Sequence, residues 1–446
     1  FGSLTGTSDG GLQSLFLCAF TTRFTWAKAI LGADSSFVSA VRLGNDRVVV
    51  LLGTTGEPIT FSQGAPDEFI YPNQAGGQVY ATYSTSGTFL GVNNLITISP
   101  ADKFFTNSIQ SAKDGSVFII GGLASEVTVA PGTPGETVLH ASDNLWGYAV
   151  LKVTPAGNLA YAVLARVTVP SHSINIDSVR STSDGGMVMS GDILGTVQFG
   201  VGNPGEPTIS TSLLDPEPLD LYHIRFNASG QFVWKHIIGG PNAEPEYSAV
   251  DVANDDSVLM ALDPRRGEGP TDVTFHVGDA GQTTFVVNPQ SGVLARTVYA
   301  KLSPSGQLLW ASGFEIEINE WRNFTATPSG GCVTVVNYPE PAMYFIGSSL
   351  SPVFNNSVET LGLLGIDPSG ALSFDVTDGG INPQDQVPNF VFGTSMAQLS
   401  QTALIIAGAY FQNATFGASS QTPVALPQIS GTAGFVATFG LDGLFK

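Results

Sequence analysis

Short apolar and polar runs alternate along this chain, and the same order of runs returns about every 70 residues. The clearest copy occupies residues 298–310 and reads VYAKLSPSGQLLW: an apolar run, a polar turn, then an apolar run ending in an aromatic residue. Glycine supplies the positive φ that a tight hairpin turn needs, and proline presets the turn position before it. The pattern predicts two antiparallel strands joined by a tight turn, here named C and D.

Copies of the C–D element run from a degenerate one at residues 16–26 to a last one at residues 435–443. Six copies carry a turn glycine, at positions 87, 157, 230, 306, 370 and 443, so the spacings are 70, 73, 76, 64 and 73 residues. Self-similarity at a steady spacing is the signature of a repeat architecture. The chain is therefore expected to repeat one supersecondary unit.

A second hairpin lies between successive C–D elements. It consists of an Asp/Gly-rich turn followed by a continuous apolar run, as in SAKDGSVFIIG at residues 111–121. A short apolar run without alternation predicts a strand buried on both faces. Six such hairpins, named A–B, contain residues 45–52, 111–121, 181–191, 254–260, 327–336 and 400–406.

A third mark lies between strands B and C. It is a short segment ending in Phe, usually with Gly soon after, at Phe61, Phe199, Phe275, Phe345, Phe416 and Phe1, with Val129 in the same place in one repeat. Four strands per repeat and no amphipathic helix predict an all-β fold, a β-propeller of four-stranded antiparallel blades. A series of β-sandwiches is the alternative, but it requires about 100 residues per repeat. Residues 1–446 are expected to form this propeller as a single domain.

The number of blades is open at this point, because the chain begins and ends mid-repeat, with seven C strands and six A–B hairpins. In one interpretation the propeller has seven blades, and residues outside this chain or another chain supply the missing hairpin. In the other, a six-bladed ring closes when the strand around Trp26 supplies the D strand of the last blade. Seven blades are favoured, with six as the alternative.

The repeats resemble the bacterial secreted β-propeller repeat family (SBBP-type repeats). The resemblance is carried by residues 298–310, 148–161 and 435–443, and it extends over essentially the whole chain. Its motifs are structural. The resemblance implies a propeller in an extracellular protein, and it supplies no catalytic residue to carry over.

Composition and charge narrow the function classes. Hydrophobic residues make up 43% and charged residues 12%, about half the usual charged share. The net charge is −20, from 17 basic and 37 acidic residues, without a basic cluster that could bind nucleic acid. An acidic surface disfavours anionic membranes, and no apolar run reaches the roughly 18 residues of a membrane span. These features predict a secreted or cell-surface protein that does not insert into the membrane.

The sequence predicts no metal and no cofactor. The histidines, at positions 140, 172, 223, 236 and 276, are scattered and lack the spacing of metal ligands, so each is expected to be a hairpin or loop residue. Cys18 and Cys332 fall inside apolar strand patterns of non-neighbouring repeats. Two buried free thiols are favoured over a disulfide.

Acid pairs are the remaining catalytic candidates. Glu315 and Glu317 alternate along a predicted strand, so their side chains share a face and lie roughly 7 Å apart. That distance is near the carboxylate separation of glycosidases. The simpler interpretation is a solvated strand face, and the same holds for Glu244 and Glu246.

Binding is expected in the long B–C and D–A connections, because variable loops on a rigid scaffold usually carry it. Arg265 and Arg266, the adjacent basic pair in one such connection, could bind a carboxylate, and Glu244 and Glu246 are further candidates. The predicted function is a non-enzymatic secreted or cell-surface module for binding or assembly, such as a subunit of an extracellular structure, with a protein or glycan of the cell surface as partner. The alternative is a carbohydrate-active hydrolase or lyase that uses acidic residues on the loop face.

Overall fold

The structure, a computed structural model, consists of β-strands and connections. It describes residues 14–20, 24–43, 47–54, 58–72, 77–97, 104–124, 126–141, 146–167, 169–200, 207–211, 219–239, 246–263, 273–276, 281–285, 297–314, 324–338, 342–346, 349–354, 360–378, 391–411, 415–416, 424–426 and 432–446. Within these residues there is no helix long and apolar enough to cross a membrane. The all-β prediction is confirmed. The chain divides into two compact units, which are described separately: Phe1–Met187 with Thr196–Ile209 and Phe226–Phe232, and Val188–Gly195 with Ser210–Arg225 and Val233–Lys446.

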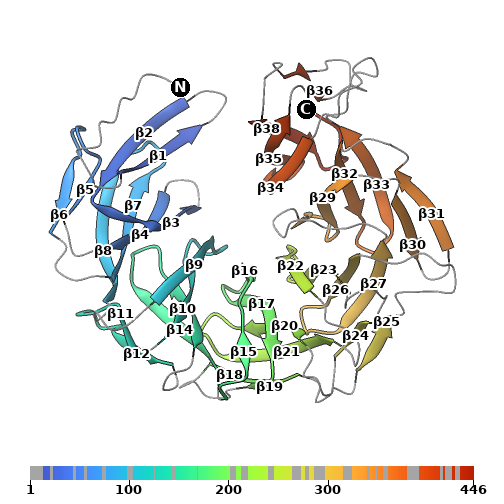
Figure 1. The fold of residues 1–446 in the computed structure, drawn as a ribbon, viewed down its shortest axis with the longest axis horizontal. Helices are drawn as coiled ribbons and strands as arrows, with labels where there is room; N and C mark the ends of the chain where they lie inside the picture. Colours follow the sequence, from blue (N-terminus) through green and yellow to red (C-terminus); the bar gives the residue numbers. More distant parts are fainter. Residues whose placement is uncertain are drawn as a thin grey trace. The chain divides into compact units, whose positions relative to one another are not determined.

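The first unit contains three antiparallel sheets, with strand orders β1-β2-β5-β6, β3-β4-β7-β8-β11-β12 and β9-β10-β13-β14-β18-β19 (Figure 1). Their strands are β1 (Ser14–Phe20), β2 (Phe24–Leu31), β3 (Ala33–Leu43), β4 (Arg47–Thr54), β5 (Ile59–Phe61), β6 (Phe69–Tyr71), β7 (Gly77–Ser84), β8 (Phe89–Thr97), β9 (Phe104–Ser111), β10 (Val117–Leu123), β11 (Glu126–Val129), β12 (Thr137–His140), β13 (Gly147–Val153), β14 (Leu159–Val167), β18 (Thr196–Phe199) and β19 (Thr208–Ser210). Strands β15 (Ser173–Ile174) and β16 (Ser178–Ser181) follow β14 in the chain.

The second unit contains the sheet strands β17-β20-β21-β24-β25, then sheets of order β22-β23-β26-β27-β30-β31, β28-β29-β32-β33, β34-β35-β38 and β36-β37. Their strands are β17 (Met187–Leu194), β20 (Asp220–Phe226), β21 (Phe232–Gly239), β22 (Glu246–Val252), β23 (Val258–Asp263), β24 (Val273–Phe275), β25 (Thr283–Phe285), β26 (Thr297–Leu302), β27 (Leu308–Phe314), β28 (Phe324–Ala326), β29 (Cys332–Tyr338), β30 (Ala342–Ile346), β31 (Ser349–Phe354), β32 (Thr360–Ile366), β33 (Leu372–Asp378), β34 (Val391–Ser400), β35 (Ala403–Phe411), β36 (Thr415–Phe416), β37 (Val424–Ala425) and β38 (Thr432–Gly440).

The predicted repeat is present in both units. Strands β3, β4, β7 and β8 lie side by side in the predicted order A-B-C-D, and β22, β23, β26 and β27 have the same order (Figure 1). The strands at the C position are β1, β7, β13, β20, β26, β32 and β38, and these define repeats 1 to 7. A closed ring and a count of seven blades stay predictions.

The B–C connections differ from the expected loops, because each described one contains strands. The hairpin formed by β11 and β12 pairs with β8, the D strand of the preceding repeat, and β18 pairs with β14 in the same way. The Phe mark lies in the first strand of each hairpin, where Phe61 is opposite Ile30 and Phe199 is opposite Ala165. Both phenylalanine side chains are fully buried. The mark therefore joins a repeat to the sheet before it.

The residue after the mark has a left-handed backbone, which explains why glycine often stands there. The φ values are 54° for Ser62, 52° for Ala130, 68° for Gly200 and 57° for His276. This conformation costs an ordinary L-residue about 1–2 kcal/mol. It lets the backbone N–H of Ala130 donate to the carbonyl of Leu95, and that of Gly200 donate to the carbonyl of Leu164, on the preceding D strand.

Consecutive sheets within each unit pack face to face, with the B strands buried on both sides. Along β4, Val49 and Leu51 pack with side chains of the β9–β14 sheet, whereas Val50 and Leu52 pack with those of the β1–β2 sheet. In the second unit β23 contributes alternate residues to two apolar clusters in the same manner. Fully burying a large aliphatic side chain contributes about 1.5–3 kcal/mol, so this two-sided packing is a main source of stability.

In four repeats an aromatic residue of the D strand packs on the C–D turn glycine of the next repeat, whereas on β8 the residue nearest to Gly157 is Asn93. The contacts pair Tyr161 with Gly230, Trp234 with Gly306, Trp310 with Gly370 and Phe374 with Gly443. A Cβ on any of these glycines would lie 2.7–2.9 Å from a ring atom. The indole N–H groups of Trp234 and Trp310 also donate to the carbonyls of Pro304 and Pro368, at 2.9 Å in both cases. The turn glycine and the aromatic residue of strand D, both recognised in the sequence, thus contact each other across neighbouring repeats.

Candidate functional site

Most of the site residues predicted from the sequence fall outside the described part of the chain. This holds for Glu244, Arg265, Arg266, Glu315 and Glu317. Glu246 is the first residue of β22, and its register partner on β23 is Asp263. These assignments therefore stay predictions.

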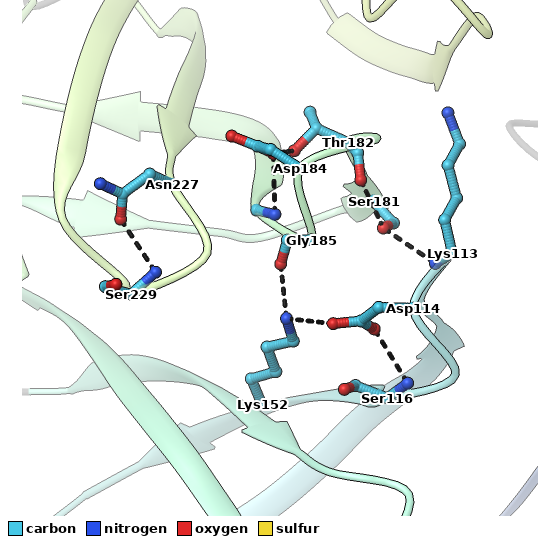
Figure 2. Close-up of polar contacts among 11 residues, drawn as sticks. Lys113, Asp114, Ser116, Lys152, Ser181, Thr182, Asp184, Gly185, Asn227 and Ser229 are labelled. Carbon is cyan, nitrogen blue, oxygen red and sulfur yellow. Dashed lines mark hydrogen bonds and ion pairs between the residues drawn. The ribbon is translucent and has the colours of Figure 1, made fainter.

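A buried ammonium group forms the best-defined polar centre of the first unit (Figure 2). Lys152, on the C strand β13, is 4% exposed. Its Nζ atom donates to the Asp114 carboxylate at 2.6 Å and to the carbonyl of Gly185 at 2.5 Å. Asp114 lies in the A–B turn of the same repeat, whereas Gly185 lies in the A–B turn of the next. The side chain thus bridges two repeats.

The aspartates of the A–B turns shape the turns themselves. The Asp114 carboxylate accepts the N–H of Ser116 at 2.9 Å, the Asp184 carboxylate accepts that of Gly186 at 3.0 Å, and the Asp255 carboxylate accepts that of Ser257 at 3.0 Å. This is the turn in which a side chain stands in for a backbone acceptor. Burial alone would raise the pKa of Asp114, but hydrogen bonds from Lys152 and Ser116 outweigh it and hold that pKa below its usual value.

Two basic residues of the second unit, Lys301 and Arg225, form similar bridges to the next repeat. Like Lys152, each lies five residues before the turn glycine of its own C–D element. Lys301 donates to the carbonyl of Gly330 at 2.7 Å, and its Nζ lies 3.9 Å from the Asp255 carboxylate. Arg225 instead donates to the carbonyl of Pro304 at 2.7 Å and lies 3.6 Å from the Asp256 carboxylate. All three cations are directed at protein acceptors of the following repeat, so they join neighbouring repeats.

Other acidic side chains in the described ranges have structural partners too. Asp67 accepts from Lys28 and from the amide of Phe89, both at 2.6 Å. Asp251, on the A strand β22, accepts the amide of Ala326 on the next A strand at 2.8 Å. No group of three metal-binding side chains occurs among the residues that the structure describes. In the described part of the chain, Asp67 and Asp251 thus join neighbouring structural elements.

Three histidines that are far apart in the sequence lie together. His223 on β20 and His236 on β21 are fully buried, with ring centroids 6.2 Å apart. The ring of His276, just after β24, is 3.9 Å from that of His236. Among the residues that the structure describes, neither ring nitrogen of His223 or His236 has a hydrogen-bond partner. The search for metal-ligand spacing missed this group, but its signal was present, because His223 and His236 stand seven residues before and six residues after the turn glycine Gly230.

Cys332 is a buried free thiol at the start of β29, as the sequence predicted. Cys18 lies in β1, opposite Ala27. Burial and the nearby Asp251 carboxylate raise the pKa of Cys332, so the thiolate is scarce at neutral pH.

We expect iodoacetamide to alkylate Cys332 at least about 100-fold more slowly in the folded protein than in denaturant, because both exposure and thiolate are lacking. Mass spectrometry of the peptide that contains Cys332 measures both rates. Equal rates would contradict the buried position.

No known family and no curated protein matches the sequence. Among solved structures, a protein of unknown function from Bacteroides caccae is 11% identical, with a TM-score of 0.27 over 67% of this chain and 90% of that one. A protein of unknown function from Dyadobacter fermentans is also 11% identical, with a TM-score of 0.36 over 91% of this chain and 94% of that one.

Proposed function

We propose that this chain is a non-enzymatic β-propeller module, secreted or displayed at the cell surface, that binds or assembles with a surface protein or glycan. We further propose that its repeats close into seven blades. The proposal is carried by one observation: buried polar side chains form hydrogen bonds between neighbouring repeats. The buried or nearly buried cations Lys152, Lys301 and Arg225 all bind carbonyls of the following repeat.

The repeat architecture supports a scaffold role. Each sheet packs on its neighbours within a unit, and a hairpin from the next repeat extends its outer edge. Sheet packing and hairpin pairing of this kind favour a rigid scaffold, whose connecting loops are exposed and can bind a partner. The negative net charge, the low share of charged residues and the resemblance to secreted propeller repeats support a location outside the cytoplasm.

The alternative function, a carbohydrate-active hydrolase or lyase, rests on Glu315 and Glu317. Incubating the purified chain with soluble polysaccharides and measuring new reducing ends tests it directly. We expect no release above the buffer blank. Release by the wild type that the double variant Glu315→Gln/Glu317→Gln abolishes would replace our proposal with the enzymatic one.

Binding is tested with the immobilised chain and a surface extract of the organism that produces it, in parallel with a cytosolic extract. We expect a component of the surface extract to be retained and to be displaced by excess free chain. A chain that is monomeric by light scattering and retains nothing that free chain displaces would contradict the assembly role. Electron-microscopy class averages count the blades, and a closed six-fold ring would overturn seven.

A further inference from the structure

Repeat 4 has histidines, His223 and His236, at two positions where the other repeats that can be compared have other residues. At the same two positions, seven before and six after the turn glycine, the other repeats place Tyr80 opposite Asn93, Val150 opposite Val163, Tyr299 opposite Ser312 and Leu363 opposite Val376. None of these pairs titrates between pH 4 and 8. Four other repeats thus form the same hairpin without histidine at these positions. The fold therefore does not require imidazole there, and structure alone does not explain the pair.

The pair is embedded in the apolar layer between two sheets of the second unit. Leu221, Trp234 and Ile238, the neighbours two positions from the histidines, belong to the cluster that joins β20 and β21 to the sheet of repeat 5. Because alternate residues of a strand share a face, His223 and His236 face this sheet as well. Ser190 on β17 is also fully buried, and its hydroxyl has no hydrogen-bond partner.

The groups around the pair do not favour a charged imidazole. The facing strands β22, β23, β26 and β27 contribute apolar residues to the layer: Val250, Val252, Val258, Met260, Leu262, Val298, Ala300, Leu302, Leu308 and Ala311. Among the described residues of the histidines' own sheet, the titratable or charged groups on the same side are His276, Arg225 on β20 and Asp192 on β17, whereas Asp220 and Lys235 lie at alternate positions and face the other side. Arg225 is paired with Asp256 of the facing sheet's A–B turn. No carboxylate of the described ranges forms a hydrogen bond with either imidazole ring. Protonation in the closed state would bury an unpaired charge, which is strongly unfavourable.

We propose that His223 and His236 form an acid-sensitive seam between the sheets of repeats 4 and 5. In the neutral state the two rings pack in the layer and the seam is closed. Protonation is possible only when the sheets separate and water reaches the rings, so acidification favours the open state and exposes the apolar faces. The seam thus makes the exposure of this surface depend on the pH of the solution around the protein.

The direction and size of the effect follow from linkage. Burial lowers the pKa of His223 from 6.5 to about 3, and burial with the nearby His223 and His276 lowers that of His236 well below its usual value. A depressed histidine pKa leaves the closed state intact above pH 6.5 and weakens it as the pH falls from there towards the folded-state value. At about pH 4.5 protonation of His223 shifts the equilibrium towards the open state by about 100-fold, and protonation of His236 acts in the same direction.

Hydrogen exchange of the whole chain at about pH 7 and about pH 4.5 tests the seam. After correction for intrinsic exchange, we expect protection in β20, β21, β23 and β26 to fall at least 100-fold at the lower pH. The fluorescence of Trp234, which lies in the same layer, reports opening independently, with a Trp234→Phe variant to assign the signal. The double variant His223→Val/His236→Val installs the pair of repeat 3 and is expected to keep its protection at pH 4.5.

The variant His223→Tyr/His236→Ser installs the pair of repeat 5 and serves if the valine variant does not fold. Protection that falls equally in the wild type and in the folded variant would overturn the proposal, as would a wild type that stays closed at pH 4.5. Titration with Zn²⁺ at pH 7 covers a competing role, since imidazole is a common zinc ligand. Stabilisation of the wild type and not of the variant by Zn²⁺ would make the pair a metal site and also overturn the acid-sensitive seam.

Discussion

Replacing Gly306 with alanine is expected to lower the free energy of unfolding by about 2–5 kcal/mol. Gly306 has φ +83°, which costs an L-residue about 1–2 kcal/mol. Its new Cβ would also lie 2.9 Å from Cδ2 of Trp234, and overpacking of this kind costs about 1–3 kcal/mol. Urea denaturation followed by circular dichroism measures the change.

Gly132→Ala is the matched control for this prediction. Gly132 has φ +72°, but a Cβ there would meet nothing within 4 Å. Its substitution should therefore cost about 1–2 kcal/mol, the backbone part alone. In addition, a Trp234→Leu background should reduce the effect of Gly306→Ala, as a double-mutant cycle would show. Equal losses at Gly306 and Gly132 would mean that the contact between repeats does not contribute.

The regular strands and turns could be predicted because their signals are local. A turn glycine, the apolar runs beside it and the aromatic four residues later lie within one short segment, as around Gly306. The hairpin that contains the Phe mark was missed, since its partner is the D strand of another repeat. Phe199 pairs with Ala165, and no local pattern specifies a pairing across that distance.

The polar contacts between repeats were harder still to predict. Lys152 meets Gly185 only because two repeats pack together, and a lysine in an apolar strand has no sequence pattern that names its acceptor. The contact between His223 and His236 follows from hairpin register, which their symmetric distances from Gly230 could have indicated. A search for close spacing along the chain cannot find a pair that a turn brings together.

Lys152→Met is expected to lower the free energy of unfolding by about 2 kcal/mol, and it tests whether the buried cation joins repeats 3 and 4. Methionine keeps the packing of the stem but leaves the carbonyl of Gly185 without its donor, and an unsatisfied buried acceptor costs about 1–3 kcal/mol. The lost ion pair adds less than about 1 kcal/mol, because the Asp114 side chain is 39% exposed. Chemical denaturation at pH 7 gives the total.

The pH dependence and a second variant separate the two contributions. The lowered pKa of Asp114 stabilises the folded state at neutral pH, and that part is lost as the pH falls below the carboxyl's ordinary value of 3.8. The difference between wild type and Lys152→Met should therefore shrink under acid. Lys301→Met removes the equivalent bond to Gly330, but its carboxylate partner is 3.9 Å away and 61% exposed, so the loss should be smaller and change less with pH. If Lys152→Met has full stability, the bridge contributes nothing to joining the two repeats, and the role assigned to these cations fails.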